Sequence, residues 1–324
     1  MSKPRITCAL AARMKPETWA AELAAALPEA EVDVWSPQSA AADYALVWQP
    51  DPGFFGTQPR LKAIFNAGAG VDALFAQALP SDVPLVRIED AGMGAQMAEY
   101  ASFAALRYYR GFDRYAEQAA RAEWAPHAPP RMADWPVGIL GYGVLGRQVA
   151  QALRGFGFAV HGWKRRPDVS ADVPLYFGDA QLADFLRATR LLICLLPLTP
   201  STRKILNRDT LALLPRGACV INLARGGLVD EVDLVAALDS GHLAGLTTDV
   251  CCPEPAPAEH PFWHHPKVLL TPHCAAITLR ENGSRAACRT CVTRPLPFCR
   301  CFTSSNARRR VFSASSRCVR STVS

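Results

Sequence analysis

Three reactive side chains lie at the ends of three consecutive apolar runs in the second half of the chain. Arg225 follows ACVINL, Glu254 follows GLTTDV, and His273 ends KVLLTPH. The carboxyl ends of parallel strands meet at the ligand-binding edge of an open sheet, so we expect these groups to converge. An arginine that clamps a carboxylate or keto oxygen and an imidazolium that supplies a proton are what the reduction of a 2-keto acid requires. Glu254, in contact with the second imidazole nitrogen, would orient His273 and favour its charged form.

Each of these residues also has a structural interpretation. Arg225 fits a solvated turn, Glu254 a proline-rich surface loop, and His273 a capped loop beside Pro272. Their occurrence at three consecutive strand ends favours catalysis over three unrelated surface roles.

A glycine pattern precedes these residues. Gly141, Gly143 and Gly146 form G-x-G-x-x-G between the apolar run VGIL and a segment with helical apolar spacing. Gly141 permits a tight turn, Gly143 lets the backbone approach a pyrophosphate, and Gly146 lets the helix pack on the strand. The pattern predicts a dinucleotide at the N-terminus of this helix.

A basic cluster indicates which dinucleotide. The next apolar run, FAVHGW, is followed by Lys164, Arg165 and Arg166, where an NAD site places an acidic residue for the ribose 2′-hydroxyl. Three cations suit a 2′-phosphate, so we expect NADPH, with NADH as a weaker cofactor. The alternative is a glycine turn in an ordinary α/β domain with a solvated basic loop.

Apolar runs rich in β-branched residues alternate with helical segments along residues 1–280, which predicts parallel sheets covered by helices. Strands are predicted at 6–10, 32–36, 43–49, 61–68, 84–89, 137–140, 158–163, 174–177, 191–196, 218–223, 245–250 and 267–273, and helices at 16–27, 71–79, 94–121 and within 230–242.

We expect an α/β protein of two Rossmann-like or flavodoxin-like parallel-sheet domains, with the active site in the cleft between them. Residues 1–95 are predicted to form the substrate domain. Residues 96–280 are predicted to form the NADP-binding domain, including the long linking helix.

Residues 281–324 differ in composition from the rest. This segment has nine arginines and one acid, Glu281, and so carries +8, whereas residues 1–280 carry −2 of the net +6. The body shows no basic face with interleaved aromatics, so we do not expect nucleic-acid binding. The cysteine pairs of the 281–324 segment do not have the spacing of a standard zinc knuckle, and no metal site is expected. We hypothesise that the native reading frame is lost near residue 281 and that this tail is disordered.

Composition favours a globular protein of the cytoplasm. Half of the 324 residues are apolar, no run is long enough to span a membrane, and the first ten residues lack a signal-peptide core. The eleven cysteines are odd in number, and Cys8, Cys194 and Cys219 lie within predicted strands. We interpret these three as small buried hydrophobes in a reducing compartment.

Residues 1 to about 280 resemble the D-isomer-specific 2-hydroxyacid dehydrogenase family, and within it the bacterial glyoxylate/hydroxypyruvate reductases. The resemblance is carried by NAGAGVD (66–72), EDAGMGAQMAEYA (89–101), GILGYGVLG (138–146), WKRR (163–166), LLPLTPST (195–202), INLARGGLVDE (221–231), the DV…EP pattern (249–255) and TPHCAAIT (271–278).

The resemblance implies roles for particular residues. It assigns catalysis to Arg225, Glu254 and His273. Ala69 and Gly70 would offer backbone amides to the substrate carboxylate, and Trp48 and Met93 would close a small pocket. The cofactor contacts that it implies are Gly141, Gly143, Val144, Leu145, Gly146, Lys164, Arg165, Arg166, Leu196, Pro197, Thr202, Leu223, Ala224 and Asp249, the last of these at the nicotinamide carboxamide.

The resemblance further implies NADPH-dependent reduction of glyoxylate to glycolate and of hydroxypyruvate to D-glycerate, by a homodimer paired through the cofactor domain. The alternatives are another D-2-hydroxyacid dehydrogenase, a non-catalytic dinucleotide-binding protein, and a defective product with an altered C-terminus. Cys251 and Cys252 replace an aromatic and a polar residue, and the charged helix that normally follows AAIT is missing. Loss of that helix is expected to loosen the hinge between the domains.

Overall fold

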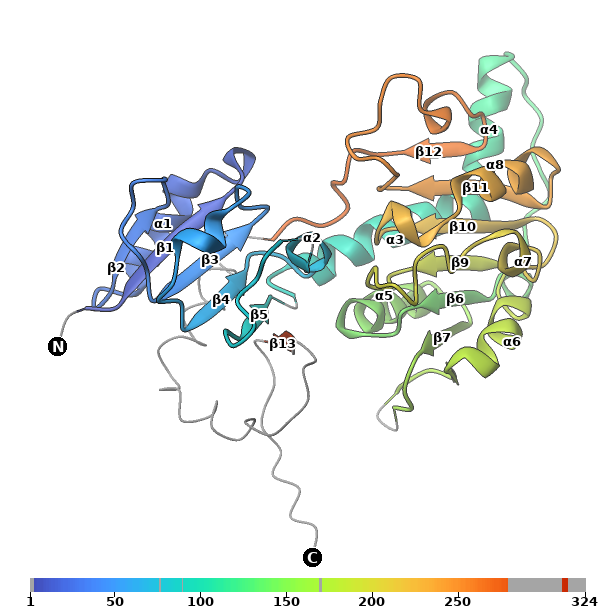
Figure 1. Ribbon diagram of the computed structural model, residues 1–324. Helices are drawn as coiled ribbons and strands as arrows, with labels where there is room; N and C mark the ends of the chain where they lie inside the picture. The colour runs from blue at the N-terminus through green and yellow to red at the C-terminus, as the bar shows by residue number, and fades with distance from the viewer. Residues whose placement is uncertain (1–2, 76, 89, 169–170, 279–310, 314–324) are drawn as a thin grey trace, which may run out of the picture. The chain divides into compact units, whose positions relative to one another are not determined.

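The computed structural model describes residues 3–75, 77–88, 90–168, 171–278 and 311–313 (Figure 1). These residues form two compact units. The first contains the chain up to Gly92 together with Thr278 and Val311–Ser313, and the second is Met93–Ile277. Each unit is an α/β structure built on a parallel sheet, as the sequence predicted. Which unit holds substrate and which holds cofactor stays a prediction.

The first unit has a sheet with the order β13-β5-β4-β3-β1-β2, and all of its strand pairs are parallel. Its elements are β1 (Arg5–Leu10), α1 (Pro16–Ala26), β2 (Glu31–Val34), β3 (Tyr44–Trp48), β4 (Ala63–Asn66), α2 (Asp72–Phe75), β5 (Leu85–Arg87) and β13 (Val311–Ser313). Alternate residues of β1 pack on opposite faces: Cys8 packs with Trp19 of α1, and Ala9 packs with Phe54 on the other side. The order 2-1-3-4-5 within this sheet is that of flavodoxin-like folds.

The second unit has a seven-stranded parallel sheet with the order β12-β11-β10-β9-β6-β7-β8. It contains α3 (Met93–Tyr109), α4 (Phe112–Ala120), β6 (Val137–Leu140), α5 (Val144–Gly155), β7 (Val160–Lys164), β8 (Leu175–Phe177), α6 (Leu182–Arg187), β9 (Leu191–Cys194), α7 (Arg208–Leu211), β10 (Ala218–Asn222), α8 (Glu231–Asp239), β11 (Leu243–Thr248) and β12 (Val268–Leu270). Strand order reverses between β6 and β9, which is the switch point at which doubly wound sheets bind ligands.

Helices cover both faces of this second sheet. Leu191 and Ile193 of β9 pack in a cluster with residues of α3 and α5, whereas Leu192 and Cys194 pack in a cluster with residues of α6, α7 and α8. A strand whose four residues are all buried on two helical layers is apolar throughout, which is why LLIC shows no alternation in the sequence.

Two predicted helices differ in extent from those observed. The segment expected as one helix over 94–121 is broken at Gly111, which has a φ of 66° and separates α3 from α4. Glycine adopts this left-handed conformation without the steric penalty of a side chain. The helix expected over 71–79 is confined to the single turn of α2.

Apart from β13, the tail at 281–324 lies outside the described residues, so the hypothesis about its reading frame and order stays a prediction. So does the interpretation of its cysteines.

Candidate active site

The glycine turn has the geometry that close approach of a phosphate requires. Gly141 has a φ of 113°, and a Cβ there would lie 2.7 Å from the backbone of Leu195. A Cβ on Gly146 would lie 2.6 Å from the carbonyl oxygen of Gly141, whereas a Cβ on Gly143 would meet nothing within 4 Å. Gly143 is also the N-cap of α5, and no side chain caps that end. The first amides of α5 therefore border open space, and these residues fit a dinucleotide pyrophosphate.

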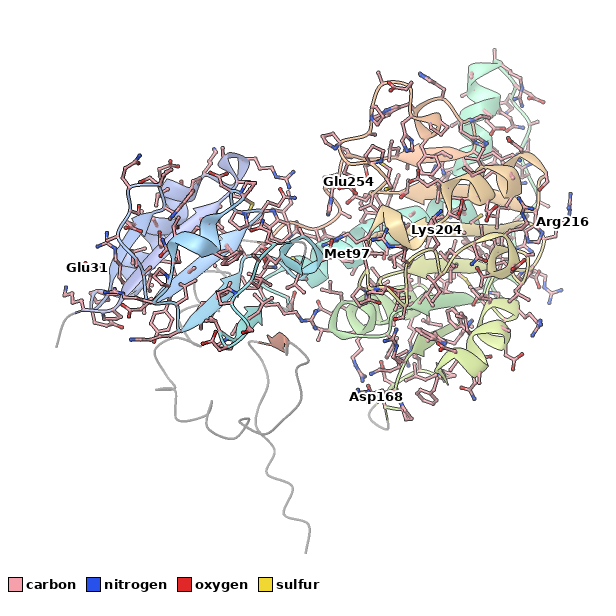
Figure 2. All side chains as sticks on the ribbon, viewed as in Figure 1. Glu31, Met97, Asp168, Lys204, Arg216 and Glu254 are labelled. Carbon is pink, nitrogen blue, oxygen red and sulfur yellow. The ribbon has the colours of Figure 1, made fainter. Side chains whose placement is uncertain are left out.

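The predicted 2′-phosphate cluster lies at and beyond the end of β7. Lys164 is its last residue, and its Nζ donates a 2.7 Å hydrogen bond to Asp168, which also accepts from Arg147 of α5. Arg165 donates a 2.6 Å hydrogen bond to the Ser201 hydroxyl. Arg166 is exposed. Figure 2 labels Asp168 below β7. Asp168 and Ser201 were not predicted from the sequence as partners of the cluster.

Arg225 follows β10 in a loop ordered by Asn222. The Asn222 side chain donates to the carbonyl oxygen of Arg225 and accepts from the amide of Ala224. At the next position a Cβ on Gly226 would lie 2.1 Å from the carbonyl oxygen of Cys251. Only glycine allows the Arg225 loop and the 251–254 loop to touch in this way.

Glu254 and His273 form a direct pair. His273 Nδ1 lies 2.7 Å from Glu254 Oε2, and the amide of Cys251 donates to Glu254 Oε1 at 3.3 Å. Burial alone would raise the pKa of Glu254, but the His273 hydrogen bond and charge, the Cys251 amide and the charge of Arg225 together hold it below its ordinary value. Arg225 and His273 thus both act electrostatically on Glu254. Because Nδ1 faces the carboxylate, Nε2 is the nitrogen left to exchange a proton with a substrate.

Asp249 holds the loop that carries His273. Its carboxylate is buried, with Oδ1 accepting from the Thr271 hydroxyl and the Cys274 amide, and Oδ2 accepting from the Ala275 amide. His273 has a φ of 53°, a left-handed conformation that costs a residue other than glycine about 1–3 kcal/mol. The contacts to Asp249 maintain it. Asp249 was expected at the nicotinamide carboxamide, and this second role in holding the loop was not predicted from the sequence.

The expected substrate loop in the first unit is also held by a buried polar side chain. Asn66, the last residue of β4, donates to the carbonyl oxygens of Gly68 at 2.7 Å and of Gly70 at 2.8 Å. Trp48 packs against the same loop, since a Cβ on Gly68 would lie 2.2 Å from its ring. Ala69 and Gly70 are half-buried. Asn66 and Trp48 therefore both hold this loop, and Asn66 was not identified from sequence.

The remaining predicted contacts belong to the second unit. Met93 begins α3 and is buried. The Thr202 hydroxyl donates to the carbonyl oxygen of Pro197 and accepts from the amide of Thr199, so it closes the loop after β9. Leu196, Leu223 and Ala224 are buried at strand ends, while Val144 is exposed and Leu145 half-buried at the start of α5. Their roles as cofactor contacts stay predictions.

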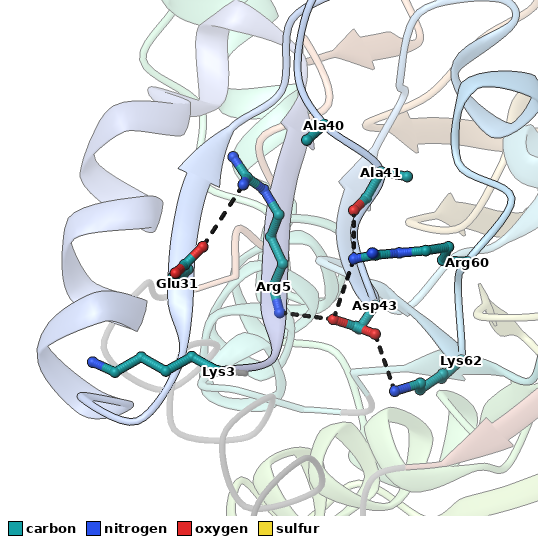
Figure 3. Close-up of a pocket in the computed structure, with 8 residues that line it drawn as sticks. All are labelled: Lys3, Arg5, Glu31, Ala40, Ala41, Asp43, Arg60 and Lys62. Atoms are coloured by element: carbon teal, nitrogen blue, oxygen red, sulfur yellow. Dashed lines mark hydrogen bonds and ion pairs between the residues drawn. The ribbon is translucent and has the colours of Figure 1, made fainter. Parts of the chain in front are cut away.

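A charged hollow of about 540 Å³ lies elsewhere in the first unit (Figure 3). It is lined by residues at the amino ends of the strands, including Arg5, Asp43 and Lys62. Lys62 pairs with Asp43 at 3.0 Å, and Arg60 pairs with the same carboxylate at 3.8 Å. Parallel sheets bind ligands at the opposite, carboxyl edge. Arg5, Arg60 and Lys62 are paired with acids and Lys3 donates to the carbonyl oxygen of Pro28, so we assign the hollow no part in the site.

The described residues contain no group of three or more metal-ligating side chains, and none of their helices is both long and apolar enough to cross a membrane. Cys8, Cys194 and Cys219 are buried free thiols, as predicted.

The chain was compared with known families and proteins. The model of the D-isomer specific 2-hydroxyacid dehydrogenase NAD-binding domain matches residues 103–275. Glyoxylate/hydroxypyruvate reductase A of Serratia proteamaculans is 48% identical over 272 residues, which cover 82% of this chain and 87% of that protein. The protein of the same name from Yersinia enterocolitica is 44% identical over 270 residues, which cover 81% and 86%.

Solved structures agree with these matches. A D-isomer specific 2-hydroxyacid dehydrogenase from Xanthobacter autotrophicus, in complex with NADPH and MES, is 38% identical with a TM-score of 0.84, covering 89% of this chain and 93% of that one. The NADPH-dependent glyoxylate/hydroxypyruvate reductase of Sinorhizobium meliloti, in complex with NADP and sulfate, is 37% identical with a TM-score of 0.83, covering 91% and 97%. The chain described here therefore belongs to the D-isomer-specific 2-hydroxyacid dehydrogenase family.

Proposed function

We propose that the protein reduces glyoxylate to glycolate and hydroxypyruvate to D-glycerate with NADPH. The observation that carries this proposal is the 2.7 Å pair of His273 and Glu254 with Arg225 close enough to lower the carboxyl pKa. Relatives that are 48% and 44% identical are named glyoxylate/hydroxypyruvate reductase A. A structural neighbour that is also named a glyoxylate/hydroxypyruvate reductase is NADPH-dependent.

The residues divide the work of the reaction. Arg225 binds the substrate carboxylate or keto oxygen through its planar pair of donors. Bound NADPH supplies the hydride that reaches the carbonyl carbon. His273 donates the proton at Nε2 to the carbonyl oxygen and is then reprotonated from solvent. Glu254 stays ionised, keeps the Nδ1 proton in place and stabilises the imidazolium.

Cofactor and substrate preference follow from two other groups of residues. Lys164, Arg165 and Arg166 favour the 2′-phosphate of NADPH over the hydroxyl of NADH, because phosphate accepts charge-assisted hydrogen bonds. The 69–70 amides bind the substrate carboxylate, and the bulk of Trp48 beside Gly68 favours small keto acids over long or aromatic ones.

The experiment is a spectrophotometric assay of NADPH consumption by the full chain with glyoxylate, hydroxypyruvate and pyruvate. We expect turnover of the first two, a preference for NADPH over NADH, and losses of about 100-fold or more in Arg225→Ala and His273→Ala. Faster turnover of pyruvate would indicate another D-2-hydroxyacid dehydrogenase. NADPH binding without turnover would indicate a non-catalytic or defective protein, and unchanged activity in both variants would refute the site.

We also propose that the protein acts as a homodimer in the cytoplasm. In the second unit, Phe112 at the start of α4 is about half exposed and Trp124, four residues after that helix, is fully exposed; such apolar side chains favour burial against a second copy. Light scattering is expected to give a dimer mass that Trp124→Ser reduces, and a monomer at all concentrations contradicts the pairing. Cell fractionation tests the location, which the buried free thiols Cys194 and Cys219 support.

A further inference from the structure

We propose that Tyr100 is a positioning residue for His273 and acts on it through Thr271 and Asp249. The proposal rests on the proposed function, in which His273 is the proton donor. Tyr100 is on α3, so a helix more than 160 residues away in the sequence would set the geometry of the catalytic loop.

The hydrogen bonds run in one direction. The Tyr100 hydroxyl lies 2.6 Å from Thr271 Oγ1, and the Thr271 hydroxyl donates a 2.6 Å bond to Asp249 Oδ1. Because the single Thr271 proton goes to the carboxylate, Thr271 can only accept from Tyr100. Burial raises the pKa of Tyr100 to about 12, so its hydroxyl keeps the proton that it donates. Tyr100 therefore donates to Thr271, and Thr271 donates to Asp249.

Asp249 passes this constraint to His273. Its two oxygens also accept from the amides of Cys274 and Ala275, and its carbonyl oxygen accepts from the amide of His273 at 2.9 Å. The loop is thus tied to Asp249 on both sides of His273. His273 is held at a positive φ, a conformation that persists only where surrounding contacts impose it. Loss of one contact lets the imidazole move relative to Glu254.

The same helix provides a matched control. Two turns after Tyr100, the hydroxyl of Tyr108 lies 2.9 Å from Thr247 Oγ1, which is the same kind of bond between α3 and the sheet. Thr247 is within β11, whereas the hydrogen bonds to the 271–275 loop come from Asp249 and from the carbonyl oxygen of Thr248. Tyr108→Phe removes a buried tyrosine–threonine bond without touching the path to His273.

The test compares Tyr100→Phe with Tyr108→Phe in two measurements. In steady-state kinetics we expect kcat of Tyr100→Phe to fall by about tenfold with little change in KM for NADPH, since a misplacement of about 1 Å can cost about 100-fold. In the free protein, NMR of ¹⁵N-histidine-labelled samples follows the Nδ1 proton of His273, assigned by its absence in His273→Gln. We expect this resonance to move upfield and to exchange faster in Tyr100→Phe, and to be unchanged in Tyr108→Phe.

A second pair of variants checks the path. Thr271→Val should reproduce both effects of Tyr100→Phe. Thr271→Ser, which keeps the hydroxyl, should instead match the wild type in both measurements. The proposal is overturned if Tyr100→Phe matches the wild type or Tyr108→Phe in both measurements. If the wild type does not reduce glyoxylate while the His273 resonance still responds to Tyr100→Phe, the proposed function fails and the positioning role stands.

Discussion

Substitution of Gly226 by alanine should separate catalysis from folding. The added Cβ would lie 2.1 Å from the carbonyl oxygen and 2.2 Å from the carbonyl carbon of Cys251. Both neighbours are backbone atoms, so no side-chain rotation relieves the overlap. Normal contact requires about 3.5 Å, so the two loops must separate by about 1.4 Å.

That separation moves the catalytic groups apart. Gly226 follows Arg225 directly, and Cys251 donates its amide to Glu254, so each loop carries one side of the site. A misplacement of about 1 Å costs about 100-fold in rate, which corresponds to about 2.7 kcal/mol of transition-state stabilisation. Overpacking should lower the free energy of unfolding by about 1–3 kcal/mol, so the variant should still fold.

Gly227→Ala is the matched control at the adjacent position. There the nearest atom to an added Cβ is the Cδ2 of Leu198 at 3.1 Å, and that side-chain end can move. The assay is kcat/KM for glyoxylate with saturating NADPH, together with a thermal melt of each variant. The reasoning is refuted if Gly226→Ala retains activity comparable to that of Gly227→Ala.

Three further predictions concern charge, space and burial. The pKa of Glu254 is depressed in the folded state, so its contribution to stability is present above the ordinary carboxyl pKa and is lost as the pH falls through the depressed value. The melting temperatures of wild type and Glu254→Gln should therefore differ at neutral pH and converge in acid. A difference that stays constant with pH would contradict this. Gly143→Ala should keep the wild-type melting temperature, because its Cβ meets nothing within 4 Å, yet weaken NADPH binding measured by fluorescence titration; unweakened binding would place the pyrophosphate elsewhere. Burial raises the pKa of the Cys194 and Cys219 thiols to about 12. Mass mapping after brief alkylation should therefore find both thiols unmodified and the exposed Cys252 labelled. Early labelling of Cys194 would disprove its burial.

Local pattern was enough to predict most of the fold. Apolar runs such as LLIC can only be buried strands or short buried helices, and their alternation with helical segments selects a parallel sheet. The helix break at Gly111 was harder to predict, because glycine within a helical pattern is often tolerated. The choice depends on packing of α3 and α4, which no local pattern contains.

Predicting the partners of the site residues was harder still. Lys164 was predicted to lie in the cofactor region because it follows the apolar run FAVHGW, but its bond to Asp168 depends on how the following loop folds back. Tyr100 and Thr271 are separated by 171 residues, so nothing in their local sequence relates them. Spacing identifies which loops meet at one edge of a sheet, whereas the bonds within those loops depend on their conformation.

Three strand ends carry the same structural device, and this changes how polar residues at such positions should be interpreted. Asn66 at the end of β4, Asn222 at the end of β10 and Asp249 directly after β11 are each at most 2% exposed. Each uses its side chain to bond backbone groups of the loop that carries expected functional residues. A buried polar side chain must be hydrogen-bonded, and the nearest partners are the backbone amides and carbonyls beyond the strand end, which have no partner in the sheet. The side chains that meet a ligand are then the less buried neighbours, such as Arg225 and His273, whose positions depend on these anchors.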